Sequence, residues 1–305
     1  MSDRLWEFKY APQKWEDLII NKDLKIPLKK ALDERPNMLL YGPPGTGKGS
    51  YVDVMVNHND ISDSTMKINA SLEGGIDTIR EKVKSFSQAS NFNIGTLKLV
   101  YLNEADHPNL MAAQQSLRQL IEDTQKLTQF VLVCNYPNNV IEELKSRLQE
   151  FNITNPPADE IFKKCEYILN NEGVKYNKKT VVEIIKRVYP DVRNTIITLR
   201  KNVVDGKLIE NVQFSASDKV FGRVLSAMQS GDPEKVRKVL KTETIYYPQL
   251  YEYLYNQIME KDSVFKNDAE ALVFIGEHAY RDSVVAIKEV NFMHMVFEML
   301  RAGVI

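Results

Sequence analysis

The 305-residue chain has few of the residues that build disulfide and metal sites: two cysteines and four histidines. Cys134 and Cys165 stand far apart and in no paired-ligand spacing, which excludes a disulfide framework and fits a reducing compartment. The histidines are scattered, so the sequence by itself predicts no zinc site. They are His58, His107, His278 and His294.

The chain also lacks an excess of charge of either sign, because 40 lysines and arginines face 41 aspartates and glutamates. Proteins that wrap nucleic acid by bulk charge are more basic than this, so any DNA contact must come from a local patch or from several copies acting together. No apolar run approaches membrane-spanning length, and the N-terminus has no apolar core of a signal peptide. We therefore expect a soluble cytoplasmic protein with no membrane partner.

What the chain does contain is a glycine-rich loop, G-P-P-G-T-G-K-G-S, at residues 42–50. It follows the apolar run 38–41 and precedes a helical stretch at 51–57, which is the strand, turn and helix context of a phosphate-binding loop. Backbone N–H groups and the helix N-terminus would face the phosphates, and Lys48 would add a full positive charge. A plain Gly/Pro surface turn is the competing interpretation, and the spacing and flanks disfavour it.

Two positions depart from the usual metal site of such a loop. Gly49 stands where a hydroxyl residue would face the metal, and Ser50 comes one place late. The apolar run 97–102 ends in Asn103 and Glu104, where a carboxylate normally helps to hold Mg²⁺ and the next glutamate polarises the attacking water. Here the metal position is an amide while the candidate base Glu104 is present. A polar turn that merely caps a strand is the alternative.

Three further polar residues are candidates for contact with phosphate. Asn135 follows the apolar run 130–134 and could orient water or the γ-phosphate, although an amide at a strand end is also ordinary turn chemistry. From sequence alone, Arg147 is by default interpreted as a solvated surface charge; the alternative is an arginine finger that reaches the nucleotide of a neighbouring subunit. Arg193 opens a helix and could touch phosphate or pair with Asp191.

Short apolar runs alternate with polar helices as far as residue 155, a pattern typical of a parallel α/β sheet. Beyond the prolines at 156 and 157 no strand pattern is seen, and helices are predicted at 158–172, 178–188 and 193–204. Turn residues near 215 mark a softer boundary before a helical remainder. The expected strands are 38–41, 66–68, 97–102 and 130–134, with 150–153 as an edge.

These motifs together resemble the AAA+ ATPases, in order and in spacing. More narrowly, four segments are similar to motifs of sliding-clamp loaders, and the resemblance covers nearly the whole chain. F-K-Y-A-P at 8–12 is similar to their E-K-Y-R-P opening, N-A-S at 69–71 with G-I-D-T-I-R at 75–80 to their DNA-facing helix, A-A-Q-Q-S-L-R at 112–118 to their coupling helix, and S-R-L at 146–148 to their S-R-C trigger. Y-P-D-V-R-N-T-I at 189–196 most resembles the large subunit of tailed-phage clamp loaders, and the replication factor C small subunits come next.

The resemblance implies three parts: an α/β P-loop (AAA+) domain with a parallel sheet over 1–155, a three-helix lid over 156–215, and an all-α collar for oligomerisation over 216–305. It implies a DNA-dependent ATPase that uses ATP and Mg²⁺ in a pentameric ring, with several copies of this chain and a smaller subunit. That ring would open a sliding clamp and load it on primer–template DNA during replication, in the host bacterial cytoplasm if the chain is phage-encoded.

The resemblance also assigns residues to roles. Lys48 would bind phosphates, Glu104 would activate water, Asn135 and Arg193 would sense the γ-phosphate, and Arg147 would complete the neighbour's site. The other nucleotide-binding positions are Glu7, Phe8, Lys9, Tyr10, Ile19, Gly45, Thr46, Gly47, Gly49 and Ser50, with the first five around the adenine. The DNA-facing positions are Ile76, Arg80 and Lys84, and the metal position is Asn103, directly or through water.

The chain departs from the family pattern at several of these motifs. Phe8 replaces a glutamate, Ala11 an arginine and Leu148 a cysteine, while Gly49 and Asn103 remove both protein groups expected to position Mg²⁺. Magnesium takes most of its ligands from water and phosphate, so water can fill the gap. The lost negative charge is worth on the order of 1–4 kcal/mol, so we expect weaker metal binding and slower turnover, with nucleotide binding retained.

Two other functions remain open on the sequence alone. The paired loss at Gly49 and Asn103 also fits a non-hydrolysing, nucleotide-holding structural subunit that only lends Arg147 to a neighbour. A different AAA+ remodeller, such as a helicase loader, is the second alternative, and it predicts hexamers where a clamp loader predicts pentamers.

Overall fold

The structure is a computed structural model that describes residues 5–72, 76–89, 98–111, 114–124, 127–209, 216–243, 245–259 and 264–305. The chain divides into two compact units, Met1–Val212 and Gln213–Ile305. Within the described ranges, no helix combines the length and the apolar character that crossing a bilayer requires.

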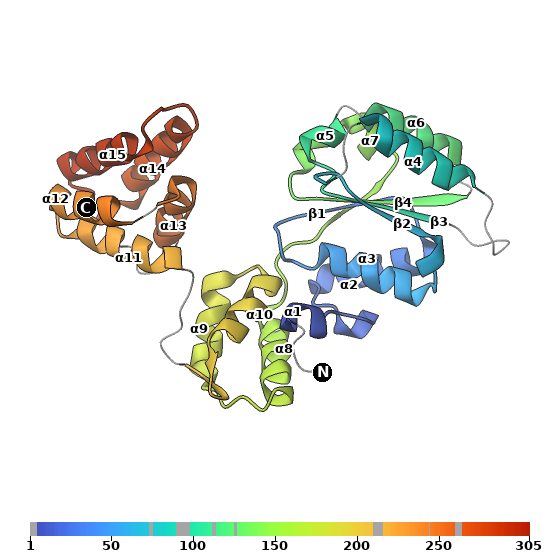
Figure 1. Ribbon diagram of the computed structural model, residues 1–305, viewed down its shortest axis with the longest axis horizontal. Coiled ribbons are helices and arrows are strands. Elements are labelled where there is room, and N and C mark those ends of the chain that lie inside the picture. Colours follow the sequence, from blue (N-terminus) through green and yellow to red (C-terminus); the bar gives the residue numbers. More distant parts are fainter. Residues whose placement is uncertain are drawn as a thin grey trace. The chain divides into compact units, whose positions relative to one another are not determined.

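A five-stranded parallel sheet organises the first unit, with strand order β2-β3-β4-β1-β5 (Figure 1). The strands are β1 (Met38–Tyr41), β2 (Thr65–Asn69), β3 (Lys98–Asn103), β4 (Thr128–Cys134) and β5 (Gln149–Asn152). β4 is buried along its whole length, because helices cover both faces of the sheet, and this explains its continuous apolar run. The parallel sheet expected from the sequence is confirmed, including the edge strand β5.

Helices pack on both faces of this sheet (Figure 1). Successive side chains of a strand point to opposite faces of the sheet, so Leu40 of β1 packs against the helices on one face and Leu39 against those on the other. One layer holds α2 (Lys22–Glu34) and α3 (Lys48–His58), and the other holds α4 (Ile76–Gln88), α5 (Pro108–Met111), α6 (Gln114–Thr124) and α7 (Glu142–Lys145). Since all strands are parallel, their carboxyl ends meet at one edge, where ligands of open α/β sheets bind.

Three helices complete the first unit, together with a short helix before the sheet. They are α8 (Ala158–Asn171), α9 (Lys178–Val188) and α10 (Val192–Lys201), and α1 (Trp6–Lys9) packs on α10. The sequence expectation was wrong in one respect, because the third helix ends at Lys201 and a two-stranded antiparallel hairpin follows, β6 (Val203–Val204) and β7 (Lys207–Leu208). Asp205 and Gly206 both have positive φ and form its two-residue turn, and strands this short leave no periodic pattern in the sequence.

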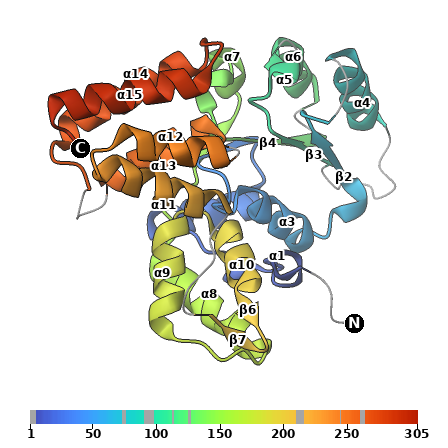
Figure 2. The same cartoon turned by 60° about the vertical axis from the view of Figure 1, so that its left-hand side comes forward.

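The second unit is helical in its described residues (Figure 2). Its core contains fully buried apolar side chains from several helices, such as Val224, Leu250 and Phe292. The helices are α11 (Ala216–Gln229), α12 (Pro233–Thr242), α13 (Tyr247–Met259), α14 (Asp268–Asp282) and α15 (Lys288–Ala302). Short 3₁₀ turns at Trp15–Asp17, Ser62–Ser64 and Pro137–Asn139 belong to the first unit.

Candidate active site

The glycine-rich loop joins β1 to α3 at the carboxyl edge of the sheet, and Lys48 is the first residue of α3. Its side chain is only 6% exposed and folds back over the loop. The Nζ donates hydrogen bonds to the carbonyl oxygens of Gly42 at 2.7 Å and Pro43 at 2.6 Å. Thr46 is also buried and its hydroxyl donates to Pro43 O at 2.9 Å. The loop therefore holds its cation ready at the helix N-terminus, where anions bind.

Burial of the Lys48 amine lowers its pKa from 10.5 to about 8. Removal of the amine from water disfavours its charged form, and the nearby positive charge of Arg193 acts in the same direction. The carboxylates of Asp106 and Asp191 oppose this effect only in part. A polyphosphate at the loop would supply the negative charge that this ammonium lacks.

The candidate base Glu104 follows β3 directly and has a positive φ of 56°. A non-glycine residue in this backbone region is uncommon, and such strain gathers at functional sites. The Glu104 Oε1 accepts a hydrogen bond of 3.4 Å from Nδ2 of Asn69, at the end of the neighbouring strand β2. The side chain of Asn69 is itself tied to Ser71. Asn69 therefore holds the Glu104 carboxylate by a long, weak contact that is easily released.

Tyr101 of β3 fills the space that Gly49 leaves. A Cβ added at Gly49 would lie 3.4 Å from the Tyr101 Oη, in ordinary contact. Burial raises the pKa of Tyr101 to about 12, so the hydroxyl stays neutral, and no hydrogen bond from it to another described residue is seen. The structure thus places a hydroxyl beside Gly49, close to where the sequence lacks one.

The donors at this edge suit a magnesium ion bound together with phosphate. Tyr101 offers a hydroxyl, half-buried Asn103 an amide oxygen and Glu104 a carboxylate, and all three are oxygen donors. Mg²⁺ typically takes one or two protein ligands and completes its shell with water and phosphate oxygens. The residues therefore fit the ion, with a weaker charge than a site that contains an aspartate at position 103.

Asn135 is exposed immediately after β4, and a buried aspartate fixes its backbone. The Asp106 Oδ2 accepts hydrogen bonds from the N–H of Asn135 at 3.0 Å and of Tyr136 at 2.8 Å. Asp106 thus sets the direction in which the Asn135 side chain leaves the sheet edge, beside β1 and the phosphate loop.

The first turn of α10 rests on the phosphate loop. Asp191 caps this helix by accepting from the N–H of Asn194 at 2.7 Å, and the N–H of Val192 donates to Gly45 O at 3.1 Å. Gly45 has φ +71°, and a Cβ there would lie 1.8 Å from the Asp191 Oδ1, so no side chain fits. Exposed Arg193 on the same turn is near enough to affect the pKa of Lys48.

A cavity of about 640 Å³ lies between the N-terminal segment and α8. Of the positions expected around the adenine, Lys9, Tyr10 and Ile19 line it. Glu7 and Phe8 are not among its described lining residues, and Phe8 is 69% exposed. Both Lys9 and Tyr10 bond to Glu172 at the end of α8, at 2.6 and 2.5 Å, so the N-terminal segment is fastened to the three-helix part.

Arg147 lies on the surface after α7 and pairs with Glu122 of α6 at 2.7 Å. Both side chains are more than one-third exposed, so the pair contributes at most about 1 kcal/mol and is easily exchanged. Fully buried Gln114 connects this region to the acidic strand end. It donates to Ala105 O at 3.3 Å and accepts from the N–H of Ile141, which immediately precedes α7.

The positions expected to face DNA belong to α4. Lys84 is exposed there. Ile76 and Arg80 lie in the same helix, but their side chains fall outside the described part of the structure.

Four residues that shape this site were given no role in it by sequence reasoning: Asn69, Tyr101, Asp106 and Asp191. Asn69 and Asp106 could have been found as polar residues at the ends of parallel strands that neighbour each other. Tyr101 carries no such signal, because a tyrosine within an apolar run is ordinary strand composition.

Comparison with known proteins agrees with this geometry. Residues 38–155 match the family model "ATPase family associated with various cellular activities (AAA)". The chain is 30% identical to the replication factor C small subunit of Sulfurisphaera tokodaii, over 91% of this chain and 89% of that protein, and 28% identical to that of Thermofilum pendens over 98% and 97%. A RuvB variant of Thermotoga maritima shares the fold, with a TM-score of 0.51, 14% identity, and coverage of 82% of this chain and 78% of that one. The chain therefore belongs to the AAA ATPases and, within them, to the clamp-loader family of the replication factor C small subunits.

Proposed function

We infer that this chain is an ATP-binding and ATP-hydrolysing subunit of a DNA polymerase clamp loader, which opens a sliding clamp and places it on primer–template DNA. The observation that carries this inference is the phosphate loop with buried Lys48, which Arg193 approaches closely enough to affect the pKa of Lys48, while Glu104 lies at the carboxyl end of β3 in the same sheet. Each has the chemistry that phosphoryl transfer to water requires.

The roles follow from the contacts. Lys48 exchanges the carbonyl oxygens of Gly42 and Pro43 for phosphate oxygens, whose negative charge favours the charged form of the amine. Glu104 leaves its weak contact with Asn69 and accepts a proton from the attacking water. Asn103 and the Tyr101 hydroxyl would help to hold Mg²⁺, and the ion would supply positive charge that neutralises the phosphates.

Two further side chains contact the γ-phosphate and so sense whether it is present. Asn135 projects from the turn that Asp106 holds, and Arg193 projects from the first turn of α10. Since this turn is bonded to Gly45 of the phosphate loop, a nucleotide that moves the loop also moves the three helices, which act as the lid. The cavity lined by Lys9, Tyr10 and Ile19 holds the adenine.

Arg147 acts on a neighbouring subunit in a ring. It exchanges Glu122 for the neighbour's triphosphate, and loss of an exposed ion pair costs little. Gln114 bonds both to Ala105, in the loop after β3, and to Ile141, before α7. A movement of Arg147 after α7 can therefore be transmitted to Glu104 through Gln114. The helices of the second unit form the collar of a pentamer that contains several copies of this chain and a smaller subunit. The segment 189–196 favours a phage loader.

The DNA contact is assigned to α4. Exposed Lys84, with Arg80 one turn and Ile76 two turns before it, would follow a phosphate backbone inside the ring. A net charge near zero agrees with DNA binding by several copies together rather than by one chain.

The deciding experiment measures Mg²⁺-dependent ATP hydrolysis by the assembled complex, with and without primed DNA and clamp. We expect stimulation by both, and a loss of about 10²–10⁴-fold in turnover for Glu104→Gln, with ATP binding unchanged. Lys84→Ala should reduce the stimulation by DNA and leave the basal rate as it was. The assignment would be refuted if DNA and clamp did not stimulate hydrolysis and Glu104→Gln did not lower the turnover.

The second candidate is a nucleotide-holding subunit that does not hydrolyse ATP and only lends Arg147 to its neighbour. Gly49 and Asn103 favour it, because both usual metal-positioning groups are missing. The variant Gly49→Ser with Asn103→Asp separates the two functions, since serine fits beside Tyr101. A hydrolysing subunit should turn over faster with these changes. A structural subunit should stay inactive, while Arg147→Ala abolishes hydrolysis by its partner.

A further inference from the structure

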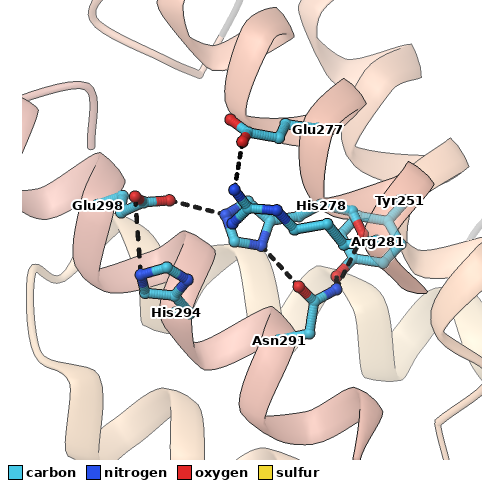
Figure 3. A network of polar contacts seen from close by, with 7 residues as sticks. All are labelled: Tyr251, Glu277, His278, Arg281, Asn291, His294 and Glu298. Atoms are coloured by element: carbon cyan, nitrogen blue, oxygen red, sulfur yellow. Dashed lines mark hydrogen bonds and ion pairs between the residues drawn. The ribbon is translucent and has the colours of Figure 1, made fainter. Parts of the chain in front are cut away.

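The structure brings together two histidines that the sequence shows as unrelated. His278 of α14 and His294 of α15 lie edge to face, with ring centroids 5.2 Å apart (Figure 3). Glu298 stands one helical turn after His294 and reaches both rings. The structure thus places two of the scattered histidines beside one carboxylate.

The distances suit one small cation. The Glu298 Oε2 lies 2.7 Å from the His278 Nε2, and the Glu298 Oε1 lies 3.7 Å from the His294 Nε2. One ligand atom from each of the three residues falls within 4.8 Å of the others. Two ligands of a tetrahedral zinc ion are about 3.4 Å apart, so small side-chain adjustments bring the set onto one ion. His294 is 55% exposed and can make them.

Hydrogen bonds behind His278 fix which of its nitrogens faces the carboxylate. Asn291 donates through Nδ2 to the backbone oxygen of His278 at 2.9 Å and to the Tyr251 Oη at 3.1 Å. The amide orientation is therefore set, and its Oδ1 lies 2.9 Å from the His278 Nδ1, which must carry a proton. Figure 3 shows the two contacts on opposite sides of the ring.

A neutral His278 would then direct the lone pair of Nε2 at the carboxylate of Glu298, which is repulsive. A cation between the two groups, either a proton or a metal ion, removes this repulsion. An Nδ1–H bonded to a carbonyl oxygen is the outer-shell arrangement of metal-binding histidines. Neighbouring charged groups have partners of their own, since Arg281 pairs with Glu277 on α14. Lys288 pairs with buried Asp282 at 3.2 Å.

We propose that the second unit binds one divalent transition-metal ion, of the zinc, nickel or cobalt kind, through the His278 Nε2, the His294 Nε2 and the Glu298 carboxylate. Two imidazoles and one carboxylate form a donor set that suits these ions better than Mg²⁺ or Ca²⁺. The exposed side of His294 leaves the fourth position to water. The ion ties α15 to α14 and so stabilises the C-terminal helix, independently of nucleotide.

The test uses the full chain without a polyhistidine tag, stripped of metal and titrated with Zn²⁺ in equilibrium dialysis. Co²⁺ serves as a spectroscopic probe, because tetrahedral binding gives intense visible ligand-field bands. We expect one ion per chain. His294→Ala and Glu298→Gln should each weaken Zn²⁺ binding by at least about tenfold and abolish the Co²⁺ bands. Both replaced side chains are partly exposed, so these variants should fold, which circular dichroism can verify.

His58→Ala is the matched control. His58 is also a half-exposed histidine beside a carboxylate, with its Nε2 3.1 Å from the Asp33 Oδ1, but it lies outside the cluster. This variant should bind Zn²⁺ like the parent chain. With Zn²⁺ at about 100 times its Kd, the parent chain should melt at a temperature raised by several degrees, and His294→Ala should not.

Two outcomes would overturn the proposal. One is Zn²⁺ binding that His294→Ala and His58→Ala leave equally strong. The other is the absence of saturable binding, with the nitrogen NMR signals of His278 showing a protonated ring that added Zn²⁺ does not change. In that case the cation between His278 and Glu298 is a proton and the cluster is a plain ion pair.

Discussion

Lys48 should make ATP binding depend on pH in a direction that its surroundings determine. In the free protein its pKa is lowered to about 8, whereas a triphosphate beside it would restore a much higher pKa. Binding above pH 8 therefore requires uptake of a proton, and the affinity should fall as the pH rises. The terminal phosphate is mostly ionised at pH 7 and fully ionised at higher pH, and the completion of this ionisation would strengthen binding as the pH rises, in the direction opposite to the expected effect.

The magnitude follows from linkage. With a free-state pKa of about 8, the fraction of protein with a charged amine falls about fivefold between pH 8 and pH 9 and approaches a tenfold fall per pH unit beyond that. Between pH 7 and pH 9.5 the Kd for ATP should increase about 30-fold, or about 2 kcal/mol. The buried hydroxyl of Tyr101 and thiol of Cys134 do not titrate here, because burial raises the pKa of each to about 12.

The assay is calorimetric titration of ATP without magnesium at several pH values, in two buffers of different ionisation enthalpy. Proton uptake should be about one-half at pH 8 and close to one at pH 9.5. Lys48→Arg is the control: arginine stays charged over this range, so the affinity of this variant for ATP should not vary with pH. A parent chain with constant affinity and no proton uptake over this range would refute the proposed exchange of carbonyl oxygens for phosphate.

Four further outcomes are expected. Glu104→Gln should leave the Kd for ATP unchanged while turnover falls, and an equal loss of both would assign the residue to binding. Gly45→Ala should lower the melting temperature by several degrees, since strain of about 1–3 kcal/mol adds to a clash with the cap of α10, whereas Gly49→Ala has room and should not. Tyr101→Phe should weaken Mg²⁺-dependent ATP binding, and Gly49→Ser added to it should restore binding; no effect of the first change would exclude the tyrosine hydroxyl. Arg147→Ala should reduce hydrolysis by the assembled ring about 10³-fold or more without changing the melting of the isolated chain.

Local sequence was sufficient for the phosphate loop and the sheet. The glycine spacing of residues 42–50 by itself predicts a backbone turn that can surround phosphate. A strand covered on both faces is buried throughout, as β4 is, and this favours a continuous apolar run. The ends of β3 and β4 also marked the edge where Glu104 and Asn135 lie, because parallel strands end on the same side. The hairpin after α10 was missed, since strands of two residues carry no period.

The sequence by itself determined the kind of fold and the residue types that face a phosphate, because backbone conformation and burial depend largely on residues that are close together in the sequence. Only the tertiary structure decided which distant side chains meet. The Tyr101 hydroxyl beside Gly49 depends on how β3 packs against α3, and Asp191 against Gly45 on how α10 docks on the loop. The pairing of His278 with Glu298 likewise depends on the register between two helices. Packing sets such contacts, and no spacing along the chain encodes them.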